Sequence, residues 1–246
     1  MNQNLNWVFL LAFLMIGSSG CYFGDDDDGG FLRCERGDGD TVTEEFDLSN
    51  FDGIQLTTDA EVFLTQGSEQ RVTVEGPENL VDLLELDVQG DTWEIEFDRC
   101  VRDADEVKIF ITIPEIRLIQ VSGSGKVFGE NRFNGENLDL RISGSGDMDL
   151  ALDYDELDAT ISGSGRMRME GAVEEFFLRI SGSGDYNAFD LVTQSGEVSI
   201  SGSGDVDVTV EQFLEVRISG SGDLSYRGFP VLDVSVTGSG DVINAN

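Results

Sequence analysis

The chain has 246 residues and carries 49 aspartates and glutamates against 15 lysines and arginines, which gives a formal net charge of −34. Nucleic acid and anionic lipid are poor partners for such a surface, so we expect no nucleic-acid binding. The absence of histidine excludes histidine-based catalytic triads and histidine-ligated metals. Because 39% of the residues are apolar, the chain is not a disordered acidic tail and can bury a core in one domain of ~200 residues.

Residues 1–20 have the layout of an export signal. They carry no charged side chain and combine an apolar run, Trp7 to Ile16, with four small residues directly before Cys21. This run is too short for a permanent transmembrane helix, which needs ~20 residues, and no later segment approaches that length. The small residues ending in cysteine resemble the lipobox of bacterial lipoproteins, which implies lipidation of Cys21. An ordinary signal peptide with an incidental cysteine is the alternative.

Residues 21–40 are predicted to form an acidic tether. The four adjacent aspartates from Asp25 to Asp28 repel one another, and the flanking glycines resist ordering. An acidic run after a lipidated cysteine resembles the signal that sends lipoproteins to the outer face of the outer membrane in some Gram-negative bacteria. The alternative is a solvated spacer that carries no sorting signal. Once Cys21 carries lipid, Cys34 and Cys100 remain available for a disulfide in an oxidising compartment.

A short unit, Ile/Val-Ser-Gly-Ser-Gly, occurs seven times and is the main evidence for the fold. It begins at Val121, Ile142, Ile161, Ile180, Ile200, Ile218 and, with Thr for the first Ser, Val236, in steps of 21, 19, 19, 20, 18 and 18 residues. Apolar and polar residues alternate around each copy, which indicates strands with one buried face. Such a unit cannot bury its own apolar face, but stacked copies build a continuous core. The sequence therefore predicts an all-β, parallel right-handed β-helix over residues 41–246, with repeats at about 117–243.

The repeated Ser-Gly-Ser-Gly is predicted to be the sharp corner of each coil. Glycine allows the positive φ that a corner demands, and stacked serine hydroxyls can hydrogen-bond along the stack. The residues assigned to this structural corner are Ser122, Gly123, Ser143, Gly144, Ser162, Gly163, Ser181, Gly182, Ser201, Gly202, Ser219, Gly220 and Gly238.

Outward-facing charges are spaced to limit repulsion between coils. Arg141, Arg179 and Arg217 precede the corner on every second coil. On each of several coils a carboxylate stands two positions before the residue that precedes the corner. These carboxylates lie within diagonal reach of the arginines. These carboxylates are Asp139, Asp158, Glu197, Glu215 and Asp233.

The segments at the two ends of the repeat region differ in sequence pattern from the repeats. Residues 41–120 show longer, less regular strands and one or two helical turns over Asn79–Leu84, so we expect wider coils that continue the solenoid and cap its first coil. The last coil, ending at residues 242–246, shows no obvious cap. Its exposed edge is a candidate surface for self-association, unless the polar tail shields it.

The Ile-Ser-Gly-Ser-Gly-Asp repeats, together with Phe51-Asp52-Gly53-Ile54 and the segment Gln70-Arg71-Val72-Thr73-Val74-Glu75-Gly76, resemble the putative auto-transporter adhesin, head GIN domain family. The resemblance covers about residues 45–243. It implies a β-helical envelope domain of exported bacterial proteins with an adhesive role. We expect no autotransporter barrel after the repeats.

The carboxylates are compatible with two kinds of chemistry. The first is a glycan-cleaving cluster of Asp185, Asp205, Asp207 and Asp223 with Arg166 and Arg168 one coil below, but short, even coils leave no long loops to wall a cleft. The second is a calcium column, because Asp147, Asp185, Asp205, Asp223 and Asp241 directly follow the corner. Lys126 and Arg166 in the same column would repel a cation, which favours aspartates that bond the N–H groups of their own corner. We therefore predict no enzyme, no catalytic residue and no cofactor.

These observations predict a non-enzymatic, lipid-anchored protein of the bacterial cell envelope. An adhesin or surface interaction module, exposed on the outer membrane and binding a protein or a glycan, is the first hypothesis. A periplasm-facing envelope scaffold or stress factor is the second. A calcium-binding solenoid and a carbohydrate-active β-helix enzyme are weaker alternatives.

Overall fold

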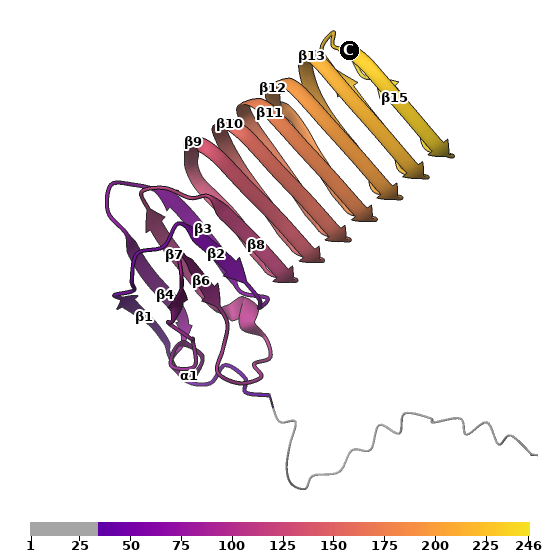
Figure 1. Cartoon of the computed structure of the whole chain (residues 1–246). Helices are drawn as coiled ribbons and strands as arrows, with labels where there is room; N and C mark the ends of the chain where they lie inside the picture. The colour runs from indigo at the N-terminus through magenta and orange to yellow at the C-terminus, as the bar shows by residue number, and fades with distance from the viewer. Residues whose placement is uncertain (1–33) are drawn as a thin grey trace, which may run out of the picture. The chain divides into compact units, whose positions relative to one another are not determined.

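Five long strands form the repeating part of the protein, each making one coil (Figure 1). The computed structural model describes residues 34–246. The strands are β9 (Lys126–Gly144), β10 (Asp147–Gly163), β11 (Arg166–Gly182), β12 (Asp185–Gly202) and β13 (Val206–Gly220). Each pairs in parallel with the next, and the corner serines and glycines fall opposite one another throughout. The predicted all-β parallel solenoid is confirmed.

The coils differ in length, and bulges absorb the difference. The register shifts between Asp149 and Ala151, and again between Ala188 and Val192 where the coil of β12 meets the shorter coil of β13. Both shifts lie on the return side of the coil, away from the corners. The corner register is therefore kept although the repeat steps vary.

Alternate residues of the long strands point inward and stack in columns. The column just before the corner contains Ile142, Ile161, Ile180, Ile200 and Ile218, each 2% exposed or less. Burial of one such side chain contributes ~1.5–3 kcal/mol, and each coil buries several apolar side chains. Because every coil repeats the same inward pattern, the columns join into one continuous core.

The two glycines of each corner have different tasks. The first has a positive φ, from 127° at Gly163 and Gly182 to 142° at Gly123, as predicted. The second is buried, and a Cβ atom at Gly165 would lie 2.4 Å from Ile142 Cγ2. Backbone bonds tie the corners together: the Ser164 N–H donates to the Gly144 carbonyl at 2.8 Å, and the other coils repeat this bond. In the described residues the corners are joined by these backbone bonds, and the Ser122 hydroxyl accepts a bond from the Gln120 side chain.

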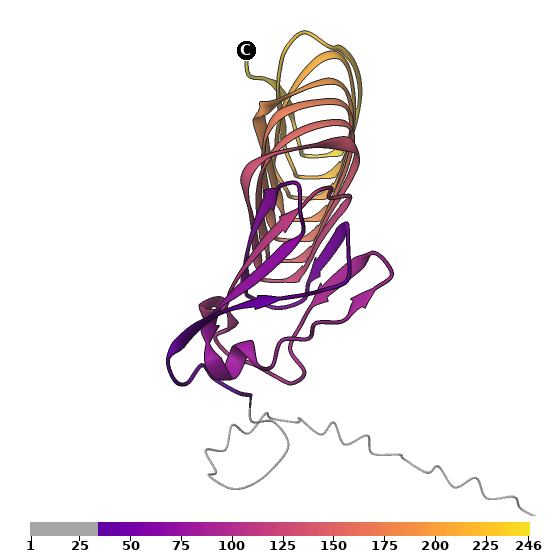
Figure 2. The same cartoon turned by 90° about the vertical axis from the view of Figure 1, so that its left-hand side faces the viewer.

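The N-terminal part has two faces that both run into β9 (Figure 2). One face contains β2 (Gly53–Leu56), β5 (Val88–Gln89), β6 (Thr92–Ile95) and β8 (Leu118–Gly123). The other contains β1 (Thr41–Phe46), β3 (Glu61–Gln66), β4 (Arg71–Pro77) and β7 (Lys108–Ile113). Two short helices, α1 (Glu78–Val81) and the 3-10 helix η1 (Ala104–Glu106), connect strands.

The expectation that residues 41–120 only continue the parallel coils is partly wrong. Strands β2, β3, β6, β7 and β8 do pair in parallel, but β4 pairs antiparallel with β7, β1 with β4, and β5 with β6. The physical reason is a short turn at residues 67–70, which reverses the chain so that β4 runs against β3. The sheet therefore begins with antiparallel edge strands.

The last complete coil is built from β14 (Leu224–Arg227) and β15 (Val231–Gly238), and β16 (Val242–Asn244) begins a further, partial coil that stacks on β14. β14 and β15 both pair in parallel with β13, and β16 pairs with β14. All eight residues of β15 are exposed. In the described part of the chain, no helix is long and apolar enough to cross a membrane.

Candidate interaction face

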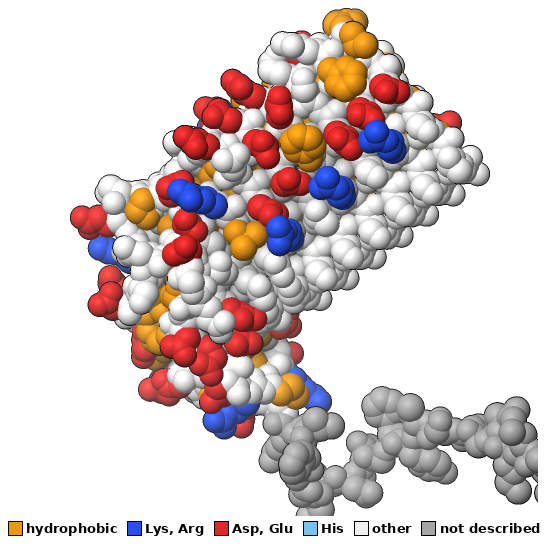
Figure 3. Space-filling model, in the orientation of Figure 1, with side chains coloured by type: hydrophobic (Ala, Val, Ile, Leu, Met, Phe, Trp, Pro, Cys, Tyr) orange, Lys and Arg blue, Asp and Glu red, His pale blue; other side chains and the backbone are white. Residues whose placement is uncertain are grey.

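One long face of the solenoid carries a row of arginines among carboxylates (Figure 3). Arg179 Nη1 lies 3.1 Å from Asp158 Oδ1, and Arg217 Nη1 lies 2.9 Å from Glu197 Oε1. Arg141 pairs with Asp139, and Arg217 also pairs with Glu215. The arrangement on every second coil is as predicted. Exposed pairs of this kind contribute only ~0.2–1 kcal/mol each, so their main effect is to relieve repulsion along the face.

The same face contains a hollow with aromatic sides. Phe177 of β11 and Phe213 of β13 border it, and the small pair Ser195 and Gly196 of β12 lies between them. Phe213 is 41% exposed, unlike the aromatic residues of the core. The carboxylates at its rim are Glu175, Glu197 and Glu215. Apolar rings beside hydrogen-bond acceptors suit a ligand that has both apolar and hydroxyl or amide groups.

Gly196 creates the floor of this hollow. The same core column has Leu157 on β10, Phe176 on β11 and Leu214 on β13. A Cβ atom at Gly196 would lie 2.0 Å from Phe176 Cε1, so the Phe176 ring occupies the space that a side chain on β12 would need. That ring also stacks on Tyr186, with centroids 6.2 Å apart. A glycine that interrupts an apolar column was the sequence signal for this site, and sequence reasoning missed it.

A second aromatic group lies on the opposite sheet face, near the N-terminal part. Phe110 of β7, Phe63 of β3 and Phe128 of β9 are neighbours across three strands, with ring centroids 5.1 and 5.4 Å apart. A shallow hollow beside Phe63 and Phe128 is also lined by Glu61, Glu130 and Asp149. This group could not be predicted from the sequence, because its members come from three strands that are not consecutive.

The aspartates after the corners do not gather into a metal site. Among residues 34–246, no group of three or more histidine, cysteine, aspartate or glutamate side chains is placed to hold a metal ion. The column is interrupted by cations, since Lys126 and Arg166 lie on either side of Asp147. Lys126 Nζ lies 3.0 Å from Glu61 Oε1, and Arg166 Nη2 lies 3.6 Å from Asp185 Oδ2. The calcium alternative therefore gains no support from the geometry of Asp185, Asp205, Asp223 and Asp241.

The alternative prediction, that these aspartates accept bonds from the N–H groups of their own corner, differs from the bonds in the structure. Those N–H groups already donate to backbone carbonyls of the preceding coil, as Asp185 N does to the Gly165 carbonyl at 3.0 Å. The one such side-chain bond in the described column runs between coils, from Asp241 N to Asp223 Oδ1 at 2.8 Å.

The carboxylates of the possible catalytic cluster lie along flat, regularly paired strands. Arg166 pairs with Asp185, whereas Arg168 pairs with Asp149 at 3.4 Å. Partial burial raises the pKa of Asp207, while a hydrogen bond from Ser225 and the charge of Arg227 act in the opposite direction. This arrangement places one perturbed carboxylate on an open surface, which is a weak basis for acid–base chemistry.

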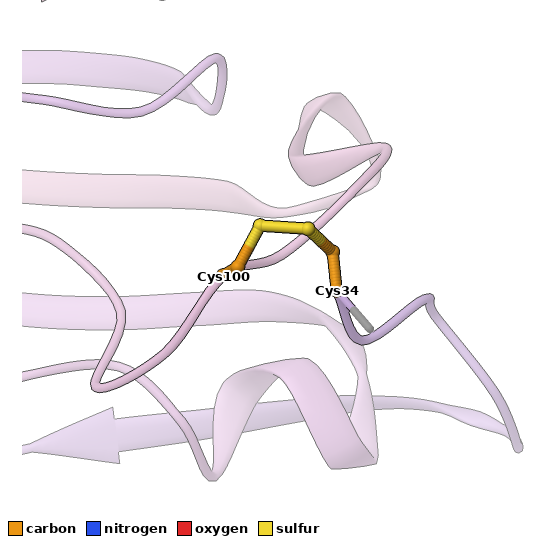
Figure 4. Close-up of a disulfide and its surroundings, with 2 residues drawn as sticks. All are labelled: Cys34 and Cys100. Carbon is orange, nitrogen blue, oxygen red and sulfur yellow. A yellow bond between two sulfur atoms is a disulfide. The ribbon is translucent and has the colours of Figure 1, made fainter. Parts of the chain in front are cut away.

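A disulfide joins Cys34 to Cys100, with Cα atoms 4.6 Å apart (Figure 4). Backbone bonds support it on both sides, since Glu35 N donates to the Cys100 carbonyl and Arg102 N donates to the Glu35 carbonyl. The start of the described chain is thereby fixed to the loop before η1. The predicted signal peptide, the lipidation site Cys21 and most of the tether lie outside the described residues.

Comparison with known proteins assigns the family. The chain matches the sequence model of the putative auto-transporter adhesin, head GIN domain, over residues 50–230. The chain belongs to this family. The family and the neighbouring structure from Bacteroides fragilis are both described as putative adhesins. No curated protein matches the chain.

Solved structures share the fold of this head GIN protein. A putative adhesin of Bacteroides fragilis has a TM-score of 0.80 and 27% identity, over 85% of this chain and 99% of that chain. A putative lipid binding protein of Parabacteroides distasonis has a TM-score of 0.71 and 24% identity, over 86% and 100%. A putative adhesin of Parabacteroides merdae has a TM-score of 0.70 and 20% identity, over 87% and 100%.

Proposed function

We propose that this head GIN protein is a lipid-anchored, non-enzymatic surface interaction module that binds a protein or glycan partner through its flat sheet faces. The observation that carries the proposal is the hollow between the half-buried Phe177 and the exposed Phe213, where aromatic rings and carboxylates lie on regular strands whose corners are in register. Sites on regular strands hold their side chains more firmly than sites on loops. Recognition then comes from repeated side chains rather than from an enclosed pocket.

The negative charge of the protein limits which classes of molecule are suitable binding partners. A net charge of −34 disfavours nucleic acid, anionic lipid headgroups and acidic glycans as ligands. Neutral sugars and basic protein surfaces are compatible with rings flanked by Glu175, Glu197 and Glu215. The membrane partner is reached through acyl chains on Cys21, with the acidic segment as a spacer.

Binding is tested on an array of glycans and proteins with the chain that lacks the predicted signal peptide. Phe213→Ser is expected to reduce capture of the best ligand at least tenfold. The matched control is Phe229→Ser, which removes an exposed phenylalanine, 87% accessible, outside the hollow. Equal losses in both variants, or none in Phe213→Ser, would contradict a role for the hollow.

Anchor and location are tested on cells. Labelling with a radioactive fatty acid should mark the wild-type chain and leave Cys21→Ser unlabelled. Protease added to intact cells should remove the solenoid if it faces outward. Protection until the outer membrane is permeabilised would contradict the surface location and place the protein in the periplasm, as an envelope scaffold.

A further inference from the structure

The last complete coil leaves one strand edge unpaired. β15 pairs with β13 on one side, and within residues 34–246 no strand pairs with its other side. Three of its side chains, Leu232, Val234 and Val236, lie directly over buried core residues of β13 but are themselves 40–42% exposed. Lysine and proline, which commonly protect an edge strand, are absent from β15. The core is therefore open at an edge that can accept another strand.

The end of the described chain limits what can cover this edge. β16 already stacks on β14, on the opposite face of the solenoid, and Ala245 N donates to the Tyr226 carbonyl at 2.8 Å. Asn246 continues this layer through two hydrogen bonds to the backbone of Gly228, at 2.8 and 2.9 Å. A second solenoid that paired its own β15 here about a twofold axis would collide with these residues. A single extended strand would not, because it needs only the β15 side of the layer.

The arginine row shows how a strand is held over a coil of this type. Arg179 stacks over Thr160 and pairs with Asp158 of the same lower coil, at 3.1 Å. Arg217 repeats the arrangement two coils further on, where the residue below it is a serine and its partner is Glu197, at 2.9 Å. Both coils that have a small hydroxyl residue at this position thus present a carboxylate to an arginine of the coil above.

β15 has the same pair of residues at its open edge. Ser235 stacks on Arg217 and follows Asp233 by two positions, as Thr160 follows its own aspartate. Asp233 is exposed and lies directly over Glu215, and in the described part of the chain it belongs to no ion pair. An arginine placed over Ser235 would therefore meet Asp233 in the arrangement that the lower coils show.

We propose that an extended segment of a partner protein adds to β15 as a parallel strand, with apolar side chains over the three exposed core positions and an arginine over Ser235. Parallel pairing is the arrangement of the neighbouring coils, and it places the arginine diagonally from Asp233. Main-chain bonds supply affinity in such strand addition, and alternate side chains supply specificity. The site is distinct from the hollow of the proposed function, whose lining residues belong to β11, β12 and β13, so the inference goes beyond that function.

Strand β13 supplies a probe, because it is the strand that stacks on the serine-bearing β12. A suitable probe is a fluorescent peptide of residues 213–220 with Glu215→Thr, which removes a like charge over Asp233 and keeps Arg217. Fluorescence anisotropy measures its binding to the chain that lacks the predicted signal peptide and carries Cys21→Ser. The parent chain should bind the peptide saturably.

Two variants of the chain test whether the peptide occupies the edge. Val234→Lys places a charge in the open core column and should weaken binding about tenfold or more. Val192→Lys is the matched control and should bind as the parent does, because Val192 is 41% exposed but lies on β12, away from the edge. Circular dichroism checks that both variants keep the strand content of the parent.

A charge exchange tests the arginine contact. Asp233→Arg should weaken binding of the probe about threefold or more, because it replaces an attraction between exposed charges with a repulsion. A peptide that also carries Arg217→Glu should bind the Asp233→Arg chain more tightly than it binds the parent. A loss that this exchanged peptide does not reverse would overturn the arginine contact.

Cysteine cross-linking tests the direction of the strand. In the parallel register the first residue of the peptide lies opposite Val231, as Phe213 itself does in β13. Peptide with Phe213→Cys should therefore form a disulfide with a chain carrying Val231→Cys and not with one carrying Thr237→Cys. The reverse preference would overturn the parallel arrangement.

Three results would overturn the proposal as a whole. The first is a parent chain that does not bind the probe. The second is equal binding by Val234→Lys and Val192→Lys. The third is a parent chain that dimerises in sedimentation equilibrium and becomes monomeric with Val234→Lys, since a second copy would then occupy the edge.

Discussion

Tyr186 and Tyr154 form a matched pair of buried tyrosines with opposite hydrogen-bonding states. The Tyr154 hydroxyl donates to the Ile116 carbonyl at 2.9 Å. The Tyr186 hydroxyl is buried without a partner, and its side chain is 0% exposed. Phenylalanine at either position removes one oxygen and keeps the ring. Because a buried, unsatisfied polar group costs ~1–3 kcal/mol, Tyr186→Phe should raise the free energy of unfolding by about 1–2 kcal/mol.

Tyr154→Phe should have the opposite effect. It removes a bond worth ~0.5–1.5 kcal/mol and leaves the carbonyl of the buried Ile116 without this donor, so the free energy of unfolding should fall by about 1 kcal/mol. Urea unfolding followed by circular dichroism, with the disulfide intact, measures both changes as shifts in midpoint at constant slope. A loss of stability in Tyr186→Phe equal to that in Tyr154→Phe would refute the reasoning, since it would reveal a partner such as a buried water.

High pH gives an independent check on the same pair. Burial raises the pKa of Tyr154 to about 12, and it raises the pKa of Tyr186 further. Above pH 10 the unfolded chain ionises its tyrosines before the folded chain does, so it binds fewer protons and the folded state loses stability as pH rises. Tyr186→Phe removes one such contribution. Its free energy of unfolding should therefore decline less steeply than that of the parent above pH 10.

Three further predictions concern the corner, the disulfide and one carboxylate. Gly163→Ala should cost about 3 kcal/mol or more in unfolding free energy, because φ is +127° and the new Cβ would lie 2.3 Å from the Gly144 carbonyl oxygen. Gly39→Ala, at φ +94° with open space, should cost only about 1–2 kcal/mol, and equal losses would contradict a steric role. Replacing both Cys34 and Cys100 by serine should lower stability by about 4 kcal/mol, from the loop entropy of a 66-residue separation, as measured by urea unfolding. The pKa of Asp207 is raised above its ordinary value of 3.8, so this residue makes the folded state lose stability as pH rises from 3.8 to the raised pKa. Asp207→Asn should therefore flatten the plot of melting temperature against pH just above pH 3.8. An unchanged plot would contradict this prediction.

The repeat region could be predicted from sequence because every level of the pattern agrees there. Spacing, glycine positions and alternation all require the same parallel stack, and the structure aligns the corners residue by residue. The N-terminal part was predicted less well. The alternation of β4 is the same for a parallel and an antiparallel partner, and its direction is set by a turn whose effect depends on distant strands. The aromatic sites were missed for a related reason, since Phe63 meets Phe110 and Phe128 only through non-consecutive pairing.

The identical corner register has a consequence for how this protein can change over evolutionary time. The 19 residues from Ser164 to Gly182 end opposite Gly163, so they form a complete coil that begins and finishes at equivalent points. Duplicating or deleting such a unit would move the far end by one strand spacing, ~4.8 Å, while leaving the core columns and both terminal coils intact. The length of the solenoid is therefore adjustable in fixed increments by unequal recombination.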